Sequence, residues 1–240
     1  MKKALVNGRW EIWLPDGIAD WDAITGDPVA RRGWEYCRFE SIQRHHHFGD
    51  VFYDVGVEHG WITAILAREF VGASSIFLIE PSPEFWVNIH KIWRWNNFDE
   101  PAGFWSGFIS DTSSGQAPSP TWPPTADATL PEVPGMAYGS LSNPKDIPTI
   151  TIDKLVKDSG VVPVSINIDI EGAELLALRG AIKTLTNQTL KNVWVSIHPD
   201  LLENFGHSKQ ELLDHMLANG WSGAHLGTDH EEHWHFTRTK

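Results

Sequence analysis

Two carboxylates, Asp169 and Glu171, stand at the end of a segment that otherwise has the pattern of a buried strand. Apolar and polar residues alternate from position 164 to position 171, whereas a central parallel strand is normally apolar on both faces. Residues two apart in an extended strand project to the same side, and α/β proteins place their sites at the carboxyl ends of such strands. Paired acids in a half-buried place are costly unless they meet a cation, a metal or a hydrogen-bond donor. The pair therefore indicates a site that performs chemistry.

His198 follows the next apolar run, residues 192 to 197, and a strand there would deliver it to the same edge of the sheet. Histidine serves as a general base or as a metal ligand. Together with Asp169 and Glu171 it admits two chemistries. The three residues can remove a proton directly, or they can bind a divalent ion that lowers the pKa of a hydroxyl. A metal-free base is slightly favoured, because an Asp-x-Glu pair and one histidine make a sparse shell for a hard metal ion.

A second signal lies in the stretch from Val51 to Gly60, where a short apolar run ends in Asp54 and Gly56. Gly60 then opens an amphipathic segment, so the pattern predicts strand, tight turn and helix. In open α/β folds such a turn binds a nucleotide-like ligand, although an ordinary turn would look the same. The spacing Gly-x-x-x-Gly is not the Gly-x-Gly-x-x-Gly of dinucleotide folds, which disfavours a nicotinamide-dependent oxidoreductase.

Glu80 ends the next apolar run, residues 76 to 79, and lies 20 residues after Gly60. An acid near this spacing can accept hydrogen bonds from both hydroxyls of a ribose. It could instead cap the following helix, which is predicted over 82–96. A third strand is predicted over 103–109 and is followed by Ser110 and Asp111. These two residues would lie beside an adenine, or they could only form hydrogen bonds to the backbone of their own turn. Turn and acid together favour an adenosine-containing ligand.

Composition sets the limits of the prediction. The chain has 240 residues, 41% of them hydrophobic, which suits one α/β domain with additions. The net charge of -12 repels phosphate backbones, so we expect no nucleic-acid partner. No apolar run approaches a membrane span and the first residues are too short for a secretory signal, so we expect a cytoplasmic protein. The 13 tryptophans also suit a glycan-binding module, but such a module would have no use for Glu80 and Asp169.

The remaining segments predict additions to this core. Residues 1–50 form an N-terminal extension, with a strand at 9–14 and a helix over 34–47, that covers one end of the sheet; residues 51–240 form the main domain. The Pro-, Ser- and Gly-rich residues 112–148 form a long loop, expected to act as a substrate lid. A helix should start at Gly172 and another should span 208–219. Two terminal strands would carry four histidines on their surface: His225, His230, His233 and His235.

Several motifs, taken in order, resemble the FkbM family of S-adenosylmethionine-dependent methyltransferases. They span roughly residues 51 to 200, and the Asp-Ile-Glu-Gly-Ala-Glu block is the most specific. The motifs are Asp54-Val55-Gly56 with Gly60, Glu80-Pro81-Ser82-Pro83, Ser110-Asp111, Thr151-Ile152-Asp153, the block from Asn167 to Glu174, and Ile197-His198-Pro199. The resemblance implies the class I methyltransferase fold, a Rossmann-like α/β fold whose seven-stranded, mostly parallel sheet carries helices on both faces. It also implies O-methylation of a hydroxyl on a sugar or small-molecule scaffold.

The resemblance also assigns residues to the donor, S-adenosylmethionine. It places Asp54, Gly56 and Gly60 around the methionine part of the donor. Glu80 would contact the ribose, and Ser110 or Asp111 would lie beside the adenine. Two departures matter, because the family usually has Asn at the position of Glu58 and Lys at the position of Asn167. Glu58 could meet the donor's α-amino group. The missing lysine leaves open what cation, if any, lies beside Asp169.

Overall fold

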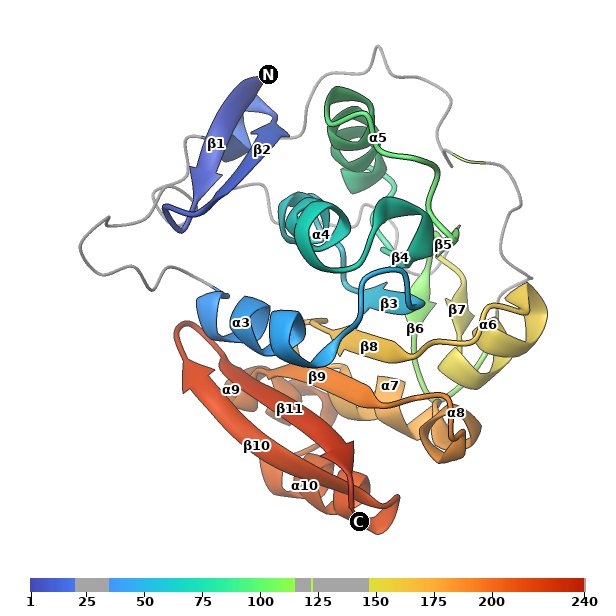
Figure 1. The fold of residues 1–240 in the computed structure, drawn as a ribbon. Coiled ribbons are helices and arrows are strands. Elements are labelled where there is room, and N and C mark those ends of the chain that lie inside the picture. The colour runs from blue at the N-terminus through green and yellow to red at the C-terminus, as the bar shows by residue number, and fades with distance from the viewer. Residues whose placement is uncertain (20–34, 115–121, 123–146, 240) are drawn as a thin grey trace.

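A seven-stranded sheet forms the centre of the molecule, in the order β10-β11-β9-β8-β3-β4-β5 (Figure 1). The computed structural model describes residues 1–19, 35–114, 122 and 147–239. Neighbours from β9 to β5 are parallel, and β11 pairs antiparallel with both β9 and β10. The strands are β3 (Phe52–Val55), β4 (Ile76–Ile79), β5 (Gly103–Trp105), β8 (Ser165–Ile168), β9 (Asn192–Ile197), β10 (Trp221–Thr228) and β11 (Glu232–Arg238). The expected seven-stranded, mostly parallel sheet is confirmed.

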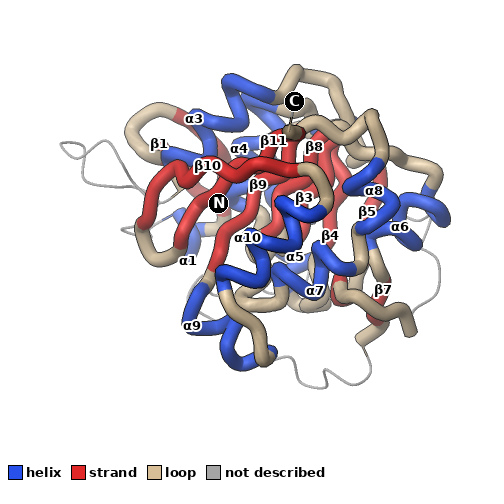
Figure 2. Tube along the Cα trace, turned by 90° about the horizontal axis from the view of Figure 1, so that it is seen from below, coloured by secondary structure: helices blue, strands red, loops and turns tan. Residues whose placement is uncertain are grey.

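Helices cover both faces of this sheet because alternate residues of its buried strands point to opposite sides. Phe52 and Leu78 belong to one hydrophobic cluster, whereas Tyr53 and Phe77 belong to the other. The first face carries α3 (Tyr36–His45), α4 (Trp61–Ile65) with a π-helical turn (Leu66–Phe70), and α5 (Phe85–Trp95). The second face carries α6 (Ile152–Ser159), α7 (Glu174–Arg179), α8 (Ile182–Thr186) and α10 (Lys209–Ala218). Figure 2, seen from below Figure 1, shows α10 and α7 in front of the strands.

The polar residues of β8 are satisfied inside the protein. Asn167 Nδ2 donates to Asp54 Oδ1 at 2.8 Å, which ties β8 to its neighbour β3. The Ser165 hydroxyl lies 2.9 Å from Nδ1 of His46, the residue that follows the last turn of α3. Half of the unexpected polar pattern of this strand therefore serves packing, because buried polar groups must find partners.

The N-terminal extension splits into two parts. The hairpin of β1 (Lys2–Val6) and β2 (Trp10–Leu14), followed by α1 (Asp16–Ala19), packs in the cluster that contains α4 and α5. Helix α3 instead lies against β10 and β11 at the end of the sheet. Helix α3 thus contacts the strands at one end of the sheet, whereas the hairpin adds a layer outside the helices. Trp34, the first residue of the predicted helix, lies outside the described residues.

Three predicted boundaries are wrong. The expected strand over 103–109 is interrupted, and its second part, β6 (Phe108–Ile109), pairs with β7 (Thr149–Ile150) in a separate two-stranded sheet. The helix expected from Gly172 begins at Glu174, because residues 171 and 172 both have a left-handed backbone. The helix expected over 82–96 begins at Phe85. Most of the predicted lid lies outside the described residues.

The C-terminal hairpin corrects the expectation for its histidines. Helix α10 begins with the predicted capping box of Ser208 and Glu211, and β10 and β11 follow it. His233 and His235 are 0% and 5% exposed, so they are core residues rather than surface residues of the hairpin. His233 is buried because β11 lies inside the sheet, between β9 and β10, and not at its edge. No helix in the described parts of the chain is long and apolar enough to cross a membrane.

Candidate functional site

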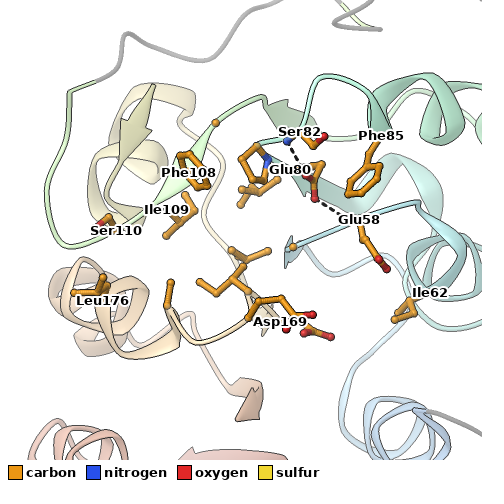
Figure 3. A pocket seen from close by; sticks show the side chains of 18 of the residues that line it. Glu58, Ile62, Glu80, Ser82, Phe85, Phe108, Ile109, Ser110, Asp169 and Leu176 are labelled. Atoms are coloured by element: carbon orange, nitrogen blue, oxygen red, sulfur yellow. Dashed lines mark hydrogen bonds between the residues drawn. The ribbon is translucent and has the colours of Figure 1, made fainter. Parts of the chain in front are cut away.

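A cavity of about 660 Å³ opens at the carboxyl ends of β3, β4 and β8 (Figure 3). Phe108, Ile109 and Leu176 line what we call the apolar end. The opposite wall, which we call the acidic end, contains four carboxylates: Glu35, Asp169, Glu171 and Glu231. Between the two ends lie the β3 turn, residues 56–60, and the β4 turn, residues 80–82. No Lys or Arg is among the described residues that line the cavity.

Gly56 has a φ of 91°, and it allows the β3 turn to approach the end of β8. A Cβ atom at this position would lie 1.7 Å from the carbonyl oxygen of Asp169, so no other residue fits without moving one of the turns. The Asp169 backbone N–H also donates to the Val55 carbonyl at 2.9 Å. The glycine expected to admit a ligand therefore also brings Asp169 next to the β3 turn.

Glu80 links the β3 and β4 turns. Its Oε2 accepts from the Glu58 backbone N–H at 2.8 Å and its Oε1 accepts from the Ser82 backbone N–H at 2.7 Å. Each carboxylate oxygen keeps a second lone pair for a ligand. Burial raises the pKa of Glu80 to about 7, although these two hydrogen bonds act to lower it. The capping role that the sequence left open is not seen, because Glu84 rather than Glu80 precedes α5.

Glu58 stands in the β3 turn and points into the cavity (Figure 3). Burial raises the pKa of this carboxyl to about 8, and the negative charges of Asp169, Glu80 and Glu171 add to the shift. A carboxylate in such a place is best stabilised by a positively charged group of a ligand.

Three residues that the resemblance assigned to a ligand do not line the cavity. Asp54 is 1% exposed, and its carboxylate accepts from Thr63 and Asn167. Gly60 precedes α4 and packs on Ile89. Asp111 is exposed outside the wall, whereas Ser110 lies at the apolar end. Asp54 and Gly60 therefore support the β3 turn from outside the cavity wall.

Asp169 follows the last residue of β8 and faces the cavity (Figure 3). Its Oδ2 accepts from Arg38 Nη1 at 3.1 Å, and the same guanidinium contacts Glu35 at 2.5 Å and donates to Ser196 at 2.6 Å. Burial and the nearby Glu231 raise the pKa of Asp169 to about 7 against the opposing effect of Arg38. A cation does lie beside Asp169, and it comes from α3 rather than from the position of Asn167.

His198 lies behind the acidic end of the cavity and is 7% exposed. A carboxylate lies beside each of its ring nitrogens. Nδ1 is 2.8 Å from Glu174 Oε1, and Nε2 is 2.6 Å from Glu231 Oε2. Burial alone would lower the pKa of His198, but the hydrogen bonds to Glu174 and Glu231 and the charge of Asp169 raise it to about 11. In this arrangement the imidazole holds its proton at neutral pH, so His198 does not suit the role of a free general base.

The structure brings Asp169, Glu171 and His198 together, but not in the way expected from an extended strand. His198 Nε2 is 3.9 Å from Asp169 Oδ1 and 3.6 Å from Glu171 Oε2. The strand has already ended, and Glu171 adopts a φ of 53°. Among the described residues only five other than glycine have a positive φ, and three of them, Glu35, Glu58 and Glu171, line the cavity. Strained backbones gather at functional sites, which supports a role for these glutamates.

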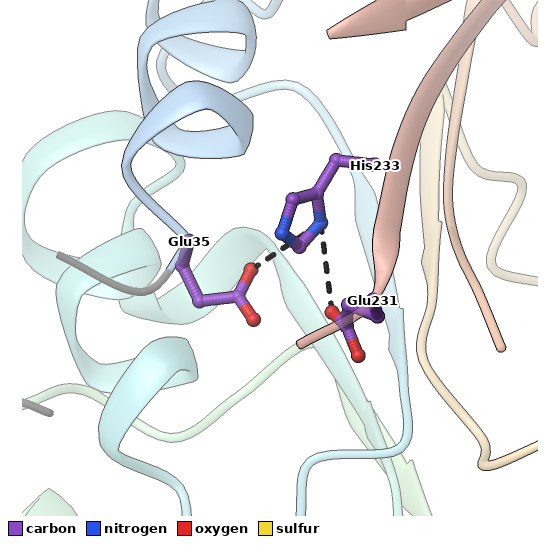
Figure 4. Close-up of side chains that lie close together, drawn as sticks. All are labelled: Glu35, Glu231 and His233. Carbon is purple, nitrogen blue, oxygen red and sulfur yellow. Dashed lines mark ion pairs between the residues drawn. The ribbon is translucent and has the colours of Figure 1, made fainter. Parts of the chain in front are cut away.

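A further cluster, which sequence reasoning missed, joins the chain's two terminal regions. His233 Nδ1 lies 3.8 Å from Glu35 Oε2 and 3.5 Å from Glu231 Oε1 (Figure 4). The Glu35 backbone N–H donates to Asp229 Oδ2 at 3.1 Å. Arg38, Glu35 and Glu231 carried no local motif that could have identified them. Glu174 did carry a signal, since it ends the Asp-Ile-Glu-Gly-Ala-Glu block.

Comparisons with known proteins identify the family and the fold. A family model, the methyltransferase FkbM domain, matches residues 50–222. No curated protein sequence matches the chain. The solved methyltransferase FkbM of Methylobacillus flagellatus KT has a TM-score of 0.50 and 16% identity, and the match covers 79% of this chain and 43% of that protein. This chain therefore spans less than half the length of that relative.

Two further solved structures share the fold. Ribosomal protein L11 methylase from Lactobacillus delbrueckii subsp. bulgaricus has a TM-score of 0.54 and 13% identity, covering 95% of this chain and 86% of that one. Precorrin-6y C5,15-methyltransferase from Geobacter metallireducens GS-15 has a TM-score of 0.50 and 10% identity, covering 93% and 96%. At these identities the likeness concerns the fold, which is the Rossmann-like fold of class I methyltransferases.

Proposed function

This chain belongs to the FkbM methyltransferase family, and from that premise we propose that it transfers the methyl group of S-adenosylmethionine to a hydroxyl of a glycan or small-molecule acceptor. The observation that carries the proposal is one cavity that joins Gly56, Glu80 and Ser110 to a wall of carboxylates. The first three suit an adenosine-containing donor, and the carboxylates suit a proton that must leave. A nicotinamide-dependent oxidoreductase or a glycan-binding module without catalysis would not belong to this family.

The donor fits the cavity in one direction. Its adenine would lie at the apolar end beside Ser110, and its ribose hydroxyls would donate to Glu80. Glu58 would then face the donor's α-amino group, and that positive charge offsets the cost of a half-buried carboxylate. The methyl group would point toward Asp169 and Glu171, which leaves the acidic end for the acceptor.

The transfer itself needs little chemistry from the protein. A lone pair of the acceptor oxygen forms the bond to the methyl carbon, and the carbon–sulfur bond breaks with its electrons going to sulfur. Because the sulfonium already makes the methyl reactive, catalysis comes mainly from holding oxygen and carbon about 3 Å apart in line, and from excluding water. The hydroxyl proton must pass to a group on the cavity wall.

Glu171 is the best placed of the three predicted catalytic residues to accept that proton. Its side chain is 63% exposed, and the nearest charged atom of His198 is 3.6 Å away. Asp169 already accepts from Arg38, and both nitrogens of His198 face carboxylates. Asp169 and His198 are therefore better suited to hold the acceptor's surroundings in place than to take up its proton.

One experiment tests the function in two steps. We expect S-adenosylhomocysteine to bind in a calorimetric titration and NAD not to bind. A donor with a deuterated methyl group, incubated with sugars and matched amino sugars, should then label oxygen, as read by mass spectrometry. In Glu171→Gln the rate should fall by about 10² to 10⁴ while donor affinity stays the same; Glu203→Gln, an exposed glutamate off the wall, is the control. Label on nitrogen would refute O-methylation, and absent donor binding would refute the whole proposal.

A further inference from the structure

We propose that Asp169, His198 and Glu231 bind a divalent metal cation at the acidic end of the cavity. These residues come from three segments: the end of β8, the end of β9 and the turn before β11. Its use in catalysis would rest on the function proposed above, whereas binding of the cation would not.

The three side chains already converge on one point. One ligand atom from each lies within 4.8 Å of the other two. His198 Nε2 is 2.6 Å from Glu231 Oε2 and 3.9 Å from Asp169 Oδ1. Around an octahedral ion with bonds of about 2.1 Å, neighbouring ligand atoms lie about 3 Å apart and opposite ones about 4.2 Å apart. The observed separations reach this geometry through small side-chain movements alone.

His198 provides a second and independent observation. Its Nε2 is buried and paired with Glu231 at 2.6 Å, and oxygens of Glu171 and Asp169 lie 3.6 and 3.9 Å away, so an ion that displaces the proton on this nitrogen would meet carboxylates already in place. The opposite nitrogen, Nδ1, is held at 2.8 Å by Glu174, a fully buried carboxylate that also accepts from the Gly172 backbone N–H. A carboxylate that orients the far nitrogen is the usual support of a metal-binding histidine.

The balance of charge also calls for a cation. Around His198 and Arg38 lie five carboxylates in mutual contact with them: Glu35, Asp169, Glu171, Glu174 and Glu231. Even with a charged histidine, the two cations leave three negative charges in a largely buried place, which is costly. A divalent ion that takes the place of the proton on His198 Nε2 would reduce this excess from three charges to two.

The neighbouring cluster of Glu35, Glu231 and His233 is a poorer site for the ion (Figure 4). Arg38 already contacts Glu35 at 2.5 Å. His233 Nε2 lies 3.0 Å from Asp229, and its Nδ1 lies 3.4 Å from Ser196. Its positions are filled by groups of the protein. Around His198, Asp169 and Glu231 both line the cavity, so an ion there would be open to a ligand.

The set of ligands indicates what the ion would be and do. Two carboxylates and one imidazole suit Mn²⁺ or Mg²⁺, which complete their shell with water and with substrate oxygens. A hydroxyl bound there would have a lowered pKa, and Glu171 at 3.6 Å from His198 Nε2 could take its proton. The ion would thus add acceptor binding to a site that otherwise only repels anions.

The direct test is a titration of the full chain with Mn²⁺, followed by electron paramagnetic resonance, with and without S-adenosylhomocysteine. We expect one saturable ion per chain. Glu231→Gln should weaken binding at least tenfold, and Glu174→Gln, which removes the carboxylate that orients His198, should weaken it by about 10- to 100-fold. Glu232→Gln is the matched control, because Glu232 is the next residue but pairs with Lys209 at 2.9 Å; its Mn²⁺ affinity should equal that of the wild type.

A second readout keeps the test valid if a variant does not fold. Pulsed resonance on the wild-type Mn²⁺ complex should detect coupling to one imidazole nitrogen, which needs no substitution. Absence of saturable Mn²⁺ binding, absence of that coupling, or equal affinities in Glu231→Gln and Glu232→Gln would overturn the proposal. Donor binding with no Mn²⁺ binding would leave the methyltransferase function standing, and the reverse result would leave the ion site standing.

Discussion

The β3 and β4 turns and the acidic end face each other across one cavity, yet they are built in different ways. In the turns, Glu80 bonds to backbone groups 2 and 22 residues away. At the acidic end, Arg38 reaches Asp169 over 131 residues and Ser196 over 158, and Glu35 reaches Asp229 over 194. The turns are local structures, whereas the acidic end forms only when helix α3 packs against the C-terminal hairpin of β10 and β11.

Different interactions also stabilise the two regions. The turns rely on backbone hydrogen bonds and on glycine, which tolerate changes in the rest of the chain. The acidic end relies on buried ion pairs, whose net contribution is small but whose separation is costly because it leaves a charge without its partner. Loss of a charge should therefore damage the two regions in different ways.

The largest effect should follow from removing the cation of the acidic end. Arg38 is 1% exposed and contacts Glu35 and Asp169, so Arg38→Met leaves two carboxylates without their partner. We expect the free energy of unfolding to fall by about 3–5 kcal/mol in urea denaturation. The matched control is Arg44→Met on the same helix, where an exposed pair with Glu40 should cost at most about 0.5 kcal/mol. Equal losses in the two variants would contradict our account of the acidic end.

The same contrast explains what could be predicted from the sequence. Apolar runs, glycines and acids within about 30 residues of each other identified β3, β4, the β3 turn and Glu80, because these elements form from neighbouring residues. The order of the motifs then led to the fold and the family. Strand β9 was predicted with its observed bounds, since a run of buried residues between turn signals leaves few alternatives.

The rest needed contacts that no local pattern encodes. Glu35 and Glu231 stand in turns where an acid usually faces solvent, and Arg38 stands on a helix whose buried side depends on β11. His233 was assigned to the surface as part of a terminal hairpin, but β11 lies inside the sheet, between β9 and β10. The resemblance assigned Asp54 to the donor, and no sequence pattern indicated its bond to Asn167 of β8. Asn167, where the family usually has Lys, thus ties β8 to β3 through Asp54, a role that the sequence could not reveal.

A smaller effect, confined to the other region, should follow from Glu80→Ala. Hydrogen bonds to a charged group contribute about 1.5–3 kcal/mol, so S-adenosylhomocysteine should bind roughly 10- to 150-fold more weakly in calorimetry. Mn²⁺ affinity should not change, because Glu80 lies outside the acidic end. Glu84→Ala, an exposed glutamate two residues after Ser82, is the control. Donor affinity that survives in Glu80→Ala with the fold intact would remove Glu80 from the site.

The smallest effect is the most specific, because it concerns one proton. The pKa of Glu80 is raised to about 7, mainly by burial, so its carboxyl is ionised above this pH and protonated below it. The ionised form accepts hydrogen bonds from two ribose hydroxyls more strongly than the neutral form, so the ligand should favour it. Affinity should therefore fall as the pH drops from 8 to 6, by at most about tenfold for each pH unit. The probe should be methylthioadenosine, which has the ribose but no amino acid part and so does not engage Glu58. Glu80→Gln, which cannot ionise, should bind it weakly and equally at every pH. If wild-type affinity were flat, or rose on acidification, the ribose would not lie on Glu80, and the division of the cavity into a donor side and an acidic acceptor side would have to be redrawn.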